Sequence, residues 1–194
     1  MIRHGQIDAK YDACTASYIA NACFTAPLTD SRREFTLKAF LVNSNGEVLS
    51  QQEFTFAVFP DVQIAENPET VWITDLEIGT HRIAGEDAVV ERTPHGLQYF
   101  LSRKTGHPAV EGFAPGDFRM WYNEKLDRLS PIAERCFRAE GFRPVLISNG
   151  AYAPRMIVGE KTFEGKRYVI CLADLRMENP PAKHLYHSLS TLKN

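Results

Sequence analysis

The sequence predicts an α/β protein with three parts: a short antiparallel, β-sandwich-like segment (1–60), a linker (61–70), and a three-layer α/β/α domain (71–194). Three observations lead to this prediction. An Asn-Gly pair joins two apolar runs near the start of the chain, the polar, Pro-bearing stretch DVQIAENPET follows, and strand-like runs then alternate with helix-like ones. Strands interleaved with helices are typical of a largely parallel sheet that is covered on both faces.

The first 60 residues have the pattern of antiparallel β structure. Stretches 18–24 and 35–42 have strand character, and apolar residues alternate with polar ones in the second. Asn45-Gly46 is the strongest short hairpin signal, so 48–59 is expected to return beside 35–42 until Pro60 ends the pairing. Three strands rarely form a sandwich alone, so the segment is predicted to be part of one.

In the second part, a capping residue followed by proline predicts where helices begin. Thr93-Pro94 is expected to open a helix that ends at Gly106, and Ser130-Pro131 one that ends at Gly141. Asn179-Pro180 opens a final helix with one apolar side. The expected strands are 71–76, 87–91, 145–148, 155–158 and 168–173.

Composition narrows the classes of function. The 194 residues are 44% apolar and carry a net charge of −2 with both signs interspersed, which gives no basic footprint for nucleic acid or a membrane surface. No apolar run approaches the roughly 20 residues that span a bilayer, and the first residues lack the apolar region of a signal peptide, so we expect a cytoplasmic protein. The four cysteines form no CxxC pair and are typical of buried thiols.

A search for catalytic patterns finds no self-contained active site. Cys136, Cys171 and Ser148 lack the flanks of a nucleophile elbow. His184 and His187 lie three residues apart, but no His-Glu-x-x-His or Glu-x-x-His pattern accompanies them. Phosphate-binding glycines are absent, and no sequence feature brings two carboxylates together. We therefore expect no catalytic residue, metal or cofactor in this chain.

The stretch HPAVEGFAPGDFRMWY (107–122) has too many Gly and Pro residues for one regular element and is predicted to be an ordered, packed connection. Two interpretations remain open. The aromatic residues fill a core, or Asp117, Trp121 and Tyr122 form a carbohydrate-binding platform on which a sugar ring stacks. Asp117 also has the position of a residue that caps a turn.

Three segments resemble a known family. FTLKAFLVNSNGEVLSQQEFTFAVFP is similar to the last hairpin of an immunoglobulin-like domain in glycoside hydrolase family 2, the β-galactosidase-type enzymes. HPAVEGFAPGDFRMWYNEKLDRLSP and GKRYVICLADLRMENPPAKHLYHSL resemble parts of the α/β domain that follows in some members. That domain resembles the class I glutamine amidotransferase fold without its catalytic cysteine. The resemblance covers roughly residues 33–192.

The resemblance implies a function. In that family the catalytic glutamates lie on an upstream barrel of about 250 residues, for which this chain has no room, so none can be carried over. The expectation is a non-catalytic C-terminal region of a carbohydrate-acting enzyme that supports the barrel, contributes oligomer contacts or binds carbohydrate. Its partners would be the catalytic barrel or another subunit, a second copy, or a sugar. The alternative is an independent small enzyme of amidotransferase-like or flavodoxin-like fold, with an unrecognised site at the C-terminal ends of its strands.

Overall fold

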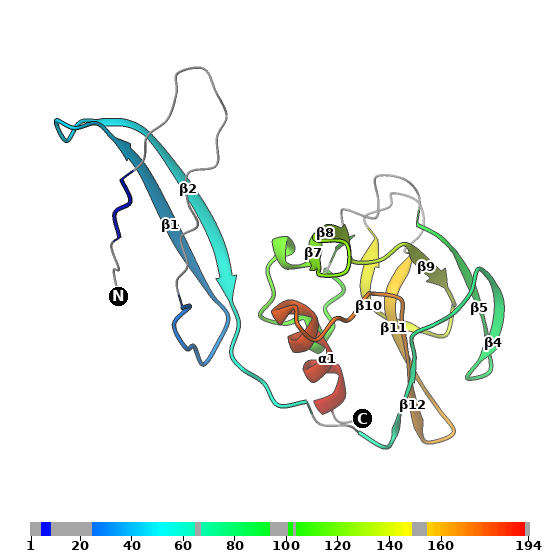
Figure 1. The fold of residues 1–194 in the computed structure, drawn as a ribbon. Helices are drawn as coiled ribbons and strands as arrows, with labels where there is room; N and C mark the ends of the chain where they lie inside the picture. Colours follow the sequence, from blue (N-terminus) through cyan, green and yellow to red (C-terminus); the bar gives the residue numbers. More distant parts are fainter. Residues whose placement is uncertain are drawn as a thin grey trace.

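A computed structural model describes residues 5–8, 25–64, 67–93, 101–102, 104–148 and 155–192. Figure 1 shows two parts: a long hairpin, β1 and β2, that projects away, and a β-rich body that carries the helix α1. The hairpin forms a sheet of its own, and the body contains an eight-stranded sheet and a small two-stranded sheet. The predicted strand 18–24 lies outside the described residues.

The hairpin confirms the prediction from the Asn-Gly pair. Strands β1 (Arg33–Val42) and β2 (Val48–Val58) are antiparallel, and Phe35 lies opposite Phe56. The Asn43 carboxamide oxygen accepts the backbone N–H groups of Asn45 and Glu47, which closes the turn. Gly46 has a φ of +83°, a conformation that glycine adopts without the steric cost that other residues meet.

The body is built on a curled, mostly antiparallel sheet. Its strand order is β3-β12-β11-β9-β5-β4, with β10 pairing with β11 and β6, and β12–β3 is the one parallel pair among the described strands. The small sheet pairs β7 with β8. The strands are β3 (Thr70–Ile73), β4 (Gly79–Ile83), β5 (Glu86–Arg92), β6 (Leu101–Ser102), β7 (Met120–Asn123), β8 (Arg128–Pro131), β9 (Arg135–Arg138), β10 (Arg143–Ser148), β11 (Met156–Phe163) and β12 (Lys166–Cys171). The helices are the 3-10 turns η2 (Pro108–Val110) and η3 (Pro115–Phe118) and the α-helix α1 (Pro180–Thr191).

Alternation along the strands gives the body two apolar cores. In β12, Val169 and Cys171 belong to one core, whereas Ile170 belongs to the other. The first core lies beneath α1, whose Leu185 and Leu189 are fully buried. The second lies on the opposite face of the sheet around Phe137. Successive side chains of a strand point to opposite faces of the sheet. A strand of a sheet that is covered on both faces therefore carries apolar residues at successive positions.

The prediction of a three-layer α/β/α domain is wrong. The described residues are mostly β, with one α-helix, and the sheet is mostly antiparallel. The expected amidotransferase-like or flavodoxin-like scaffold is therefore not the architecture of this body.

The final helix is confirmed, whereas two other helix predictions are not. Helix α1 begins at Pro180, directly after Asn179. Ser130-Pro131 ends strand β8, and Cys136 and Phe137 lie in β9, where they enter different cores. Most of the helix expected after Thr93-Pro94 lies outside the described residues, but Leu101–Ser102 forms strand β6.

Candidate interaction surface

One face of the hairpin is apolar and exposed to solvent. In β1, Leu37 and Leu41 lie on the same face as Phe35 and Ala39, and the register places Phe54 of β2 beside Leu37. The side chains remain 53% exposed at Phe54, 40% at Leu37 and 38% at Leu41. Phe35 stacks on Phe56 with ring centroids 6.0 Å apart, which orders the end of this face nearest the body. We call the apolar residues of this face the apolar face: Phe35, Leu37, Ala39, Leu41, Phe54, Phe56 and Val58. Arg33, Ser50 and Gln52 lie on the same side of the hairpin.

The opposite face of the hairpin is largely polar. Thr36 lies opposite Thr55, and Lys38 lies opposite Glu53 with Nζ and Oε1 2.6 Å apart. Towards the turn this side also carries exposed apolar residues: Phe40 (52%), Val42 (48%) and Leu49 (55%). A strand pair with one apolar and one polar face is typical of a sheet that packs against a second layer. Figure 1 shows that the body does not supply that layer, because the hairpin projects away from it.

A buried ion pair fixes the entry of the hairpin to the body. The Arg32 guanidinium donates from Nε to Asp117 Oδ2 (2.7 Å) and from a terminal nitrogen to Oδ1 (3.0 Å). The Asp117 side chain is 6% exposed and also accepts the backbone N–H of Ala114 at 2.7 Å. The hydrogen bond to Asp117 raises the pKa of Arg32, although burial opposes this. Two parallel hydrogen bonds between these planar groups set the direction in which the chain enters β1.

The exit of the hairpin is held by α1. The Phe59 ring packs 5.6 Å from the Phe113 ring and 5.5 Å from the His184 ring, measured between centroids. Burial, together with the nearby His187, lowers the pKa of His184, so the neutral imidazole is favoured in this apolar contact. Further along, Lys183 Nζ lies 2.7 Å from Asp61 Oδ1, and His187 Nδ1 donates to the Gln63 carbonyl at 2.8 Å.

The predicted carbohydrate-binding residues do not form one exposed platform. The Asp117 carboxylate is engaged by Arg32, and the Trp121 side chain is buried, with its Nε1 donating to the Asp117 carbonyl at 2.9 Å. Tyr122 is the next residue of β7 and is 43% exposed, with its hydroxyl bonded to Asp127. Trp121 and Tyr122 are neighbours in β7, so their side chains leave the strand on opposite faces.

A buried ionic network links the sheet to α1, and sequence reasoning did not find it. His107 Nδ1 accepts the backbone N–H of Ala109 (3.2 Å), so Nε2 carries the proton and donates to Glu160 Oε1 at 2.6 Å. Arg167 Nε donates to Glu160 Oε2 at 2.7 Å, and Arg167 also donates to the Leu189 carbonyl of α1. Burial alone would raise the pKa of Glu160, but the hydrogen bonds from His107 and Arg167 lower it to about 2. Both ring nitrogens of His107 are engaged in hydrogen bonds, so no ring nitrogen is free to act as a base. The His107–Glu160 pair therefore has a structural role.

The thiols and histidines of the described body show no reactive arrangement. Burial raises the pKa of Cys136, and it raises the pKa of Cys171 to about 12, so both stay protonated at neutral pH. The described residues contain no group of three His, Cys, Asp or Glu side chains that could hold a metal ion. The His184 and His187 rings are 6.4 Å apart and contact Phe59 and the Gln63 carbonyl respectively.

Comparison with protein-family models, with curated proteins and with solved structures finds no match to this chain. In the described part of the chain, no helix is long and apolar enough to cross a membrane.

Proposed function

We propose that the chain is a non-catalytic structural region whose hairpin β1–β2 completes a β-sandwich with another part of a β-galactosidase-type glycoside hydrolase. The observation that carries this proposal is the exposed apolar face, with Leu37 and Phe54 at its centre. Large apolar side chains that gather on one face of a paired strand and stay about half exposed are typical of a sheet that packs against a second layer.

The dimensions of the hairpin favour a partner that is wider than a second hairpin. A strand of ten residues is roughly 33 Å long and two strands are roughly 10 Å wide, a footprint of roughly 330 Å². Stable interfaces bury roughly 800 Å² on each partner, so one hairpin packed on another falls short. Among the described residues β1 and β2 pair only with each other, so their outer edges can also accept strands. A complete sandwich would use the face and both edges.

The resemblance of this hairpin to a family 2 hairpin identifies the proposed partner. Stretch 35–60 ends in the Phe-Ala-Val-Phe-Pro exit on which that resemblance rests, and Phe59 of this exit packs onto the body. The resemblance of the later segments implied an α/β fold that the body does not have. The proposal therefore rests on the hairpin alone.

The test is reconstitution with a β-galactosidase-type enzyme truncated before its corresponding hairpin. We expect an equimolar complex in which the amides of 33–58 exchange with deuterium far more slowly than in the free chain. Leu37→Lys combined with Phe54→Lys should abolish the complex, because two charges would be buried without partners. The matched control is Thr36→Lys combined with Thr55→Lys, a cross-strand pair on the opposite face, which should still bind.

Three outcomes would contradict the proposal. Equal binding by both double variants would show that the apolar face is not the contact. If the hairpin amides of the free chain exchanged with deuterium as slowly as those of β11 and β12, the hairpin would be stable without a partner. A free chain that dimerises, and becomes monomeric in the Leu37→Lys, Phe54→Lys variant, would identify a second copy as the occupant.

A further inference from the structure

A groove in the body lies between the β7–β8 sheet and the segment that joins β12 to α1. Its volume is about 560 Å³, within the range of small-molecule sites. Ile132 and Ala173 belong to its floor, and Leu126, Met177 and Tyr186 give it apolar walls. The groove is separate from the hairpin, so an inference about it does not rest on the docking role proposed above.

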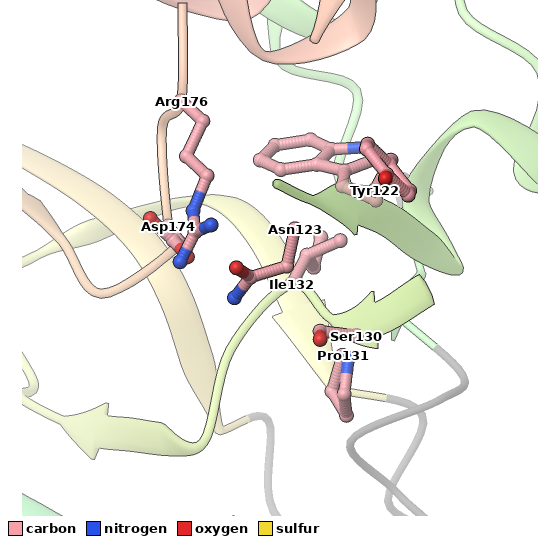
Figure 2. A pocket seen from close by; sticks show the side chains of 8 residues that line it. Tyr122, Asn123, Ser130, Pro131, Ile132, Asp174 and Arg176 are labelled. Atoms are coloured by element: carbon pink, nitrogen blue, oxygen red, sulfur yellow. The ribbon is translucent and has the colours of Figure 1, made fainter. Parts of the chain in front are cut away.

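Polar side chains meet at one end of this groove. Figure 2 shows Arg176 beside Asp174, with the Asn123 side chain directed toward them. Arg176 Nε donates to Asp174 Oδ2 at 2.6 Å. In the part of the chain that the structure describes, Asp174 Oδ1 and the terminal nitrogens of Arg176 have no protein partner. The ion pair therefore offers one acceptor and several donors side by side.

The backbone holds this ion pair firmly in place. The Asp174 N–H donates to the Ile132 carbonyl at 2.7 Å, and the Arg176 N–H donates to the Asp174 carbonyl at 2.8 Å. Asn179 Nδ2 donates to the Tyr122 carbonyl at 3.1 Å, which joins the start of α1 to β7. Ser130 adds a buried hydroxyl that has no hydrogen-bond partner among the described residues. The polar groups are thus positioned before any ligand arrives.

The charges of the lining favour a neutral ligand with hydroxyl groups. The charged residues of the lining are Arg128, Arg135 and Arg176 and the carboxylates Glu134 and Asp174. Arg135 is itself bonded to the Leu76 carbonyl and to Asp75, with a distance of 3.4 Å to the Asp75 carboxylate. A free anion would meet two carboxylates at this surface. A hydroxyl group is both donor and acceptor, and an adjacent carboxylate and guanidinium match both functions.

We infer that this groove binds a neutral saccharide of one or two rings. Asp174, Arg176 and the Asn123 amide nitrogen, whose carboxamide oxygen already accepts the Leu126 N–H, would hydrogen-bond to its hydroxyl groups. Met177, and the face of the Tyr186 ring that is not stacked on Trp72, would contact its C–H face. This places carbohydrate recognition at a different site from the Asp117, Trp121 and Tyr122 platform that the sequence suggested. The two tests are independent, because a body that binds sugar can do so whether or not the hairpin is covered.

The experiment is a calorimetric titration of the full chain with lactose and cellobiose, and with glucuronate and inorganic phosphate as anionic probes. We expect saturable binding of a neutral disaccharide, with a Kd below about 10 mM. Asp174→Asn should weaken it at least about tenfold, because a charged acceptor is lost. Asp87→Asn is the matched control, since Asp87 is also an exposed carboxylate paired with an arginine, 2.9 Å from Arg82, but lies on β5 away from the groove.

Amide chemical-shift mapping of the unmodified chain is the second measurement. Saccharide should shift the resonances of residues 123, 128–135 and 172–177 and leave those of β4 and β5 unchanged. The inference would be overturned if no saturable binding occurred up to about 20 mM, or if phosphate or glucuronate bound more tightly than the disaccharides. It would also be overturned if the shifts lay elsewhere in the chain, or if Asp174→Asn and Asp87→Asn lost the same amount of affinity.

Discussion

A single carboxylate, Glu160, couples three distant segments of the body. Its two oxygens accept hydrogen bonds from His107 in the connection before η2 and from Arg167 in β12, and Arg167 reaches the last turn of α1. The Glu160 side chain is 15% exposed, so the carboxylate is screened from water but not isolated from it. Charge-assisted hydrogen bonds of this kind are stronger than neutral ones, and they stabilise the ionised form.

The stability of the protein should therefore depend on pH through Glu160. Its pKa is about 2 in the folded protein and 4.5 in the unfolded chain, so its contribution is complete above pH 4.5 and is lost as the pH falls toward 2. The difference corresponds to about 3 kcal/mol of unfolding free energy. Urea titrations at several pH values should show Glu160→Gln less stable than the unmodified protein at pH 7, with the gap narrowing by about this amount by pH 2.

Glu111→Gln is the control for this titration. Glu111 is an exposed carboxylate in the connection between β6 and β7, which also contains His107. Its replacement should leave the pH dependence of the unfolding free energy unchanged. A gap between Glu160→Gln and the unmodified protein that stays constant from pH 7 to pH 2 would contradict the role assigned to the network.

At the level of elements, the hairpin is joined to the body mainly through its two ends. Arg32 and Asp117 are 85 residues apart in sequence, and their ion pair connects the start of β1 to η3. Arg32→Met should leave the Asp117 carboxylate buried without its charge partner, at a cost of about 2 kcal/mol in unfolding free energy. Urea unfolding followed by tryptophan fluorescence would measure this, because Trp121 donates to the Asp117 carbonyl.

Arg33→Met is the matched control for that prediction. Arg33 is the neighbouring arginine, and its pair with Asp30 is exposed, with side-chain exposures of 60% and 86%. Exposed pairs contribute little, so this change should cost less than about 0.5 kcal/mol. Similar losses in both variants would show that the buried Arg32–Asp117 ion pair contributes no more to stability than the exposed pair does.

Elements that depend on neighbouring residues could be predicted from the sequence. The turn between β1 and β2 is closed by Asn43 and Gly46 within five residues, and α1 begins at the Asn179-Pro180 signal. Strand β9 could not be predicted in this way, because its pairing partner is β5, and Cys136 lies opposite Glu91. The Ser130-Pro131 signal satisfies the local rules for a helix start, but antiparallel pairing with the preceding strand β7 overrides it.

The candidate sites also divide into those set by residues close in sequence and those set by residues far apart. The apolar face could be read from the alternation of Phe35, Leu37 and Leu41, since it lies within one hairpin. The groove could not, because Asn123 and Asp174 approach each other only through the fold of the body. The isolated His107 gave no signal of a network whose carboxylate lies 53 residues away.

At the level of the whole molecule, the body should open as one unit. Cys136 and Cys171 are fully buried in the first core, where the pKa of each thiol is raised by burial. In a variant with Cys14→Ser and Cys23→Ser, neither remaining thiol should react with Ellman's reagent in the native state at pH 8. Both should become reactive across the same urea transition that fluorescence reports.

Denatured protein supplies the control, since both thiols must react there at the rate of an exposed cysteine. Rapid reaction of one thiol in the absence of urea would show that part of the sheet opens independently of the rest. In that case strands β9 and β12, which carry the two thiols, would not open as one cooperative unit.

The apolar face also has a consequence for the cell that makes this chain. Residues 54–59, Phe-Thr-Phe-Ala-Val-Phe, form a six-residue run without charge or proline, mostly in a strand whose outer edge is unpaired among the described residues. Such runs recruit identical copies into stacked, fibre-like sheets when they remain uncovered. Lys38 and Glu53 place charges on the polar face that oppose this stacking. If a partner covers this face as proposed, synthesis of the chain in excess over that partner favours aggregation, and the hairpin itself requires balanced production of the two.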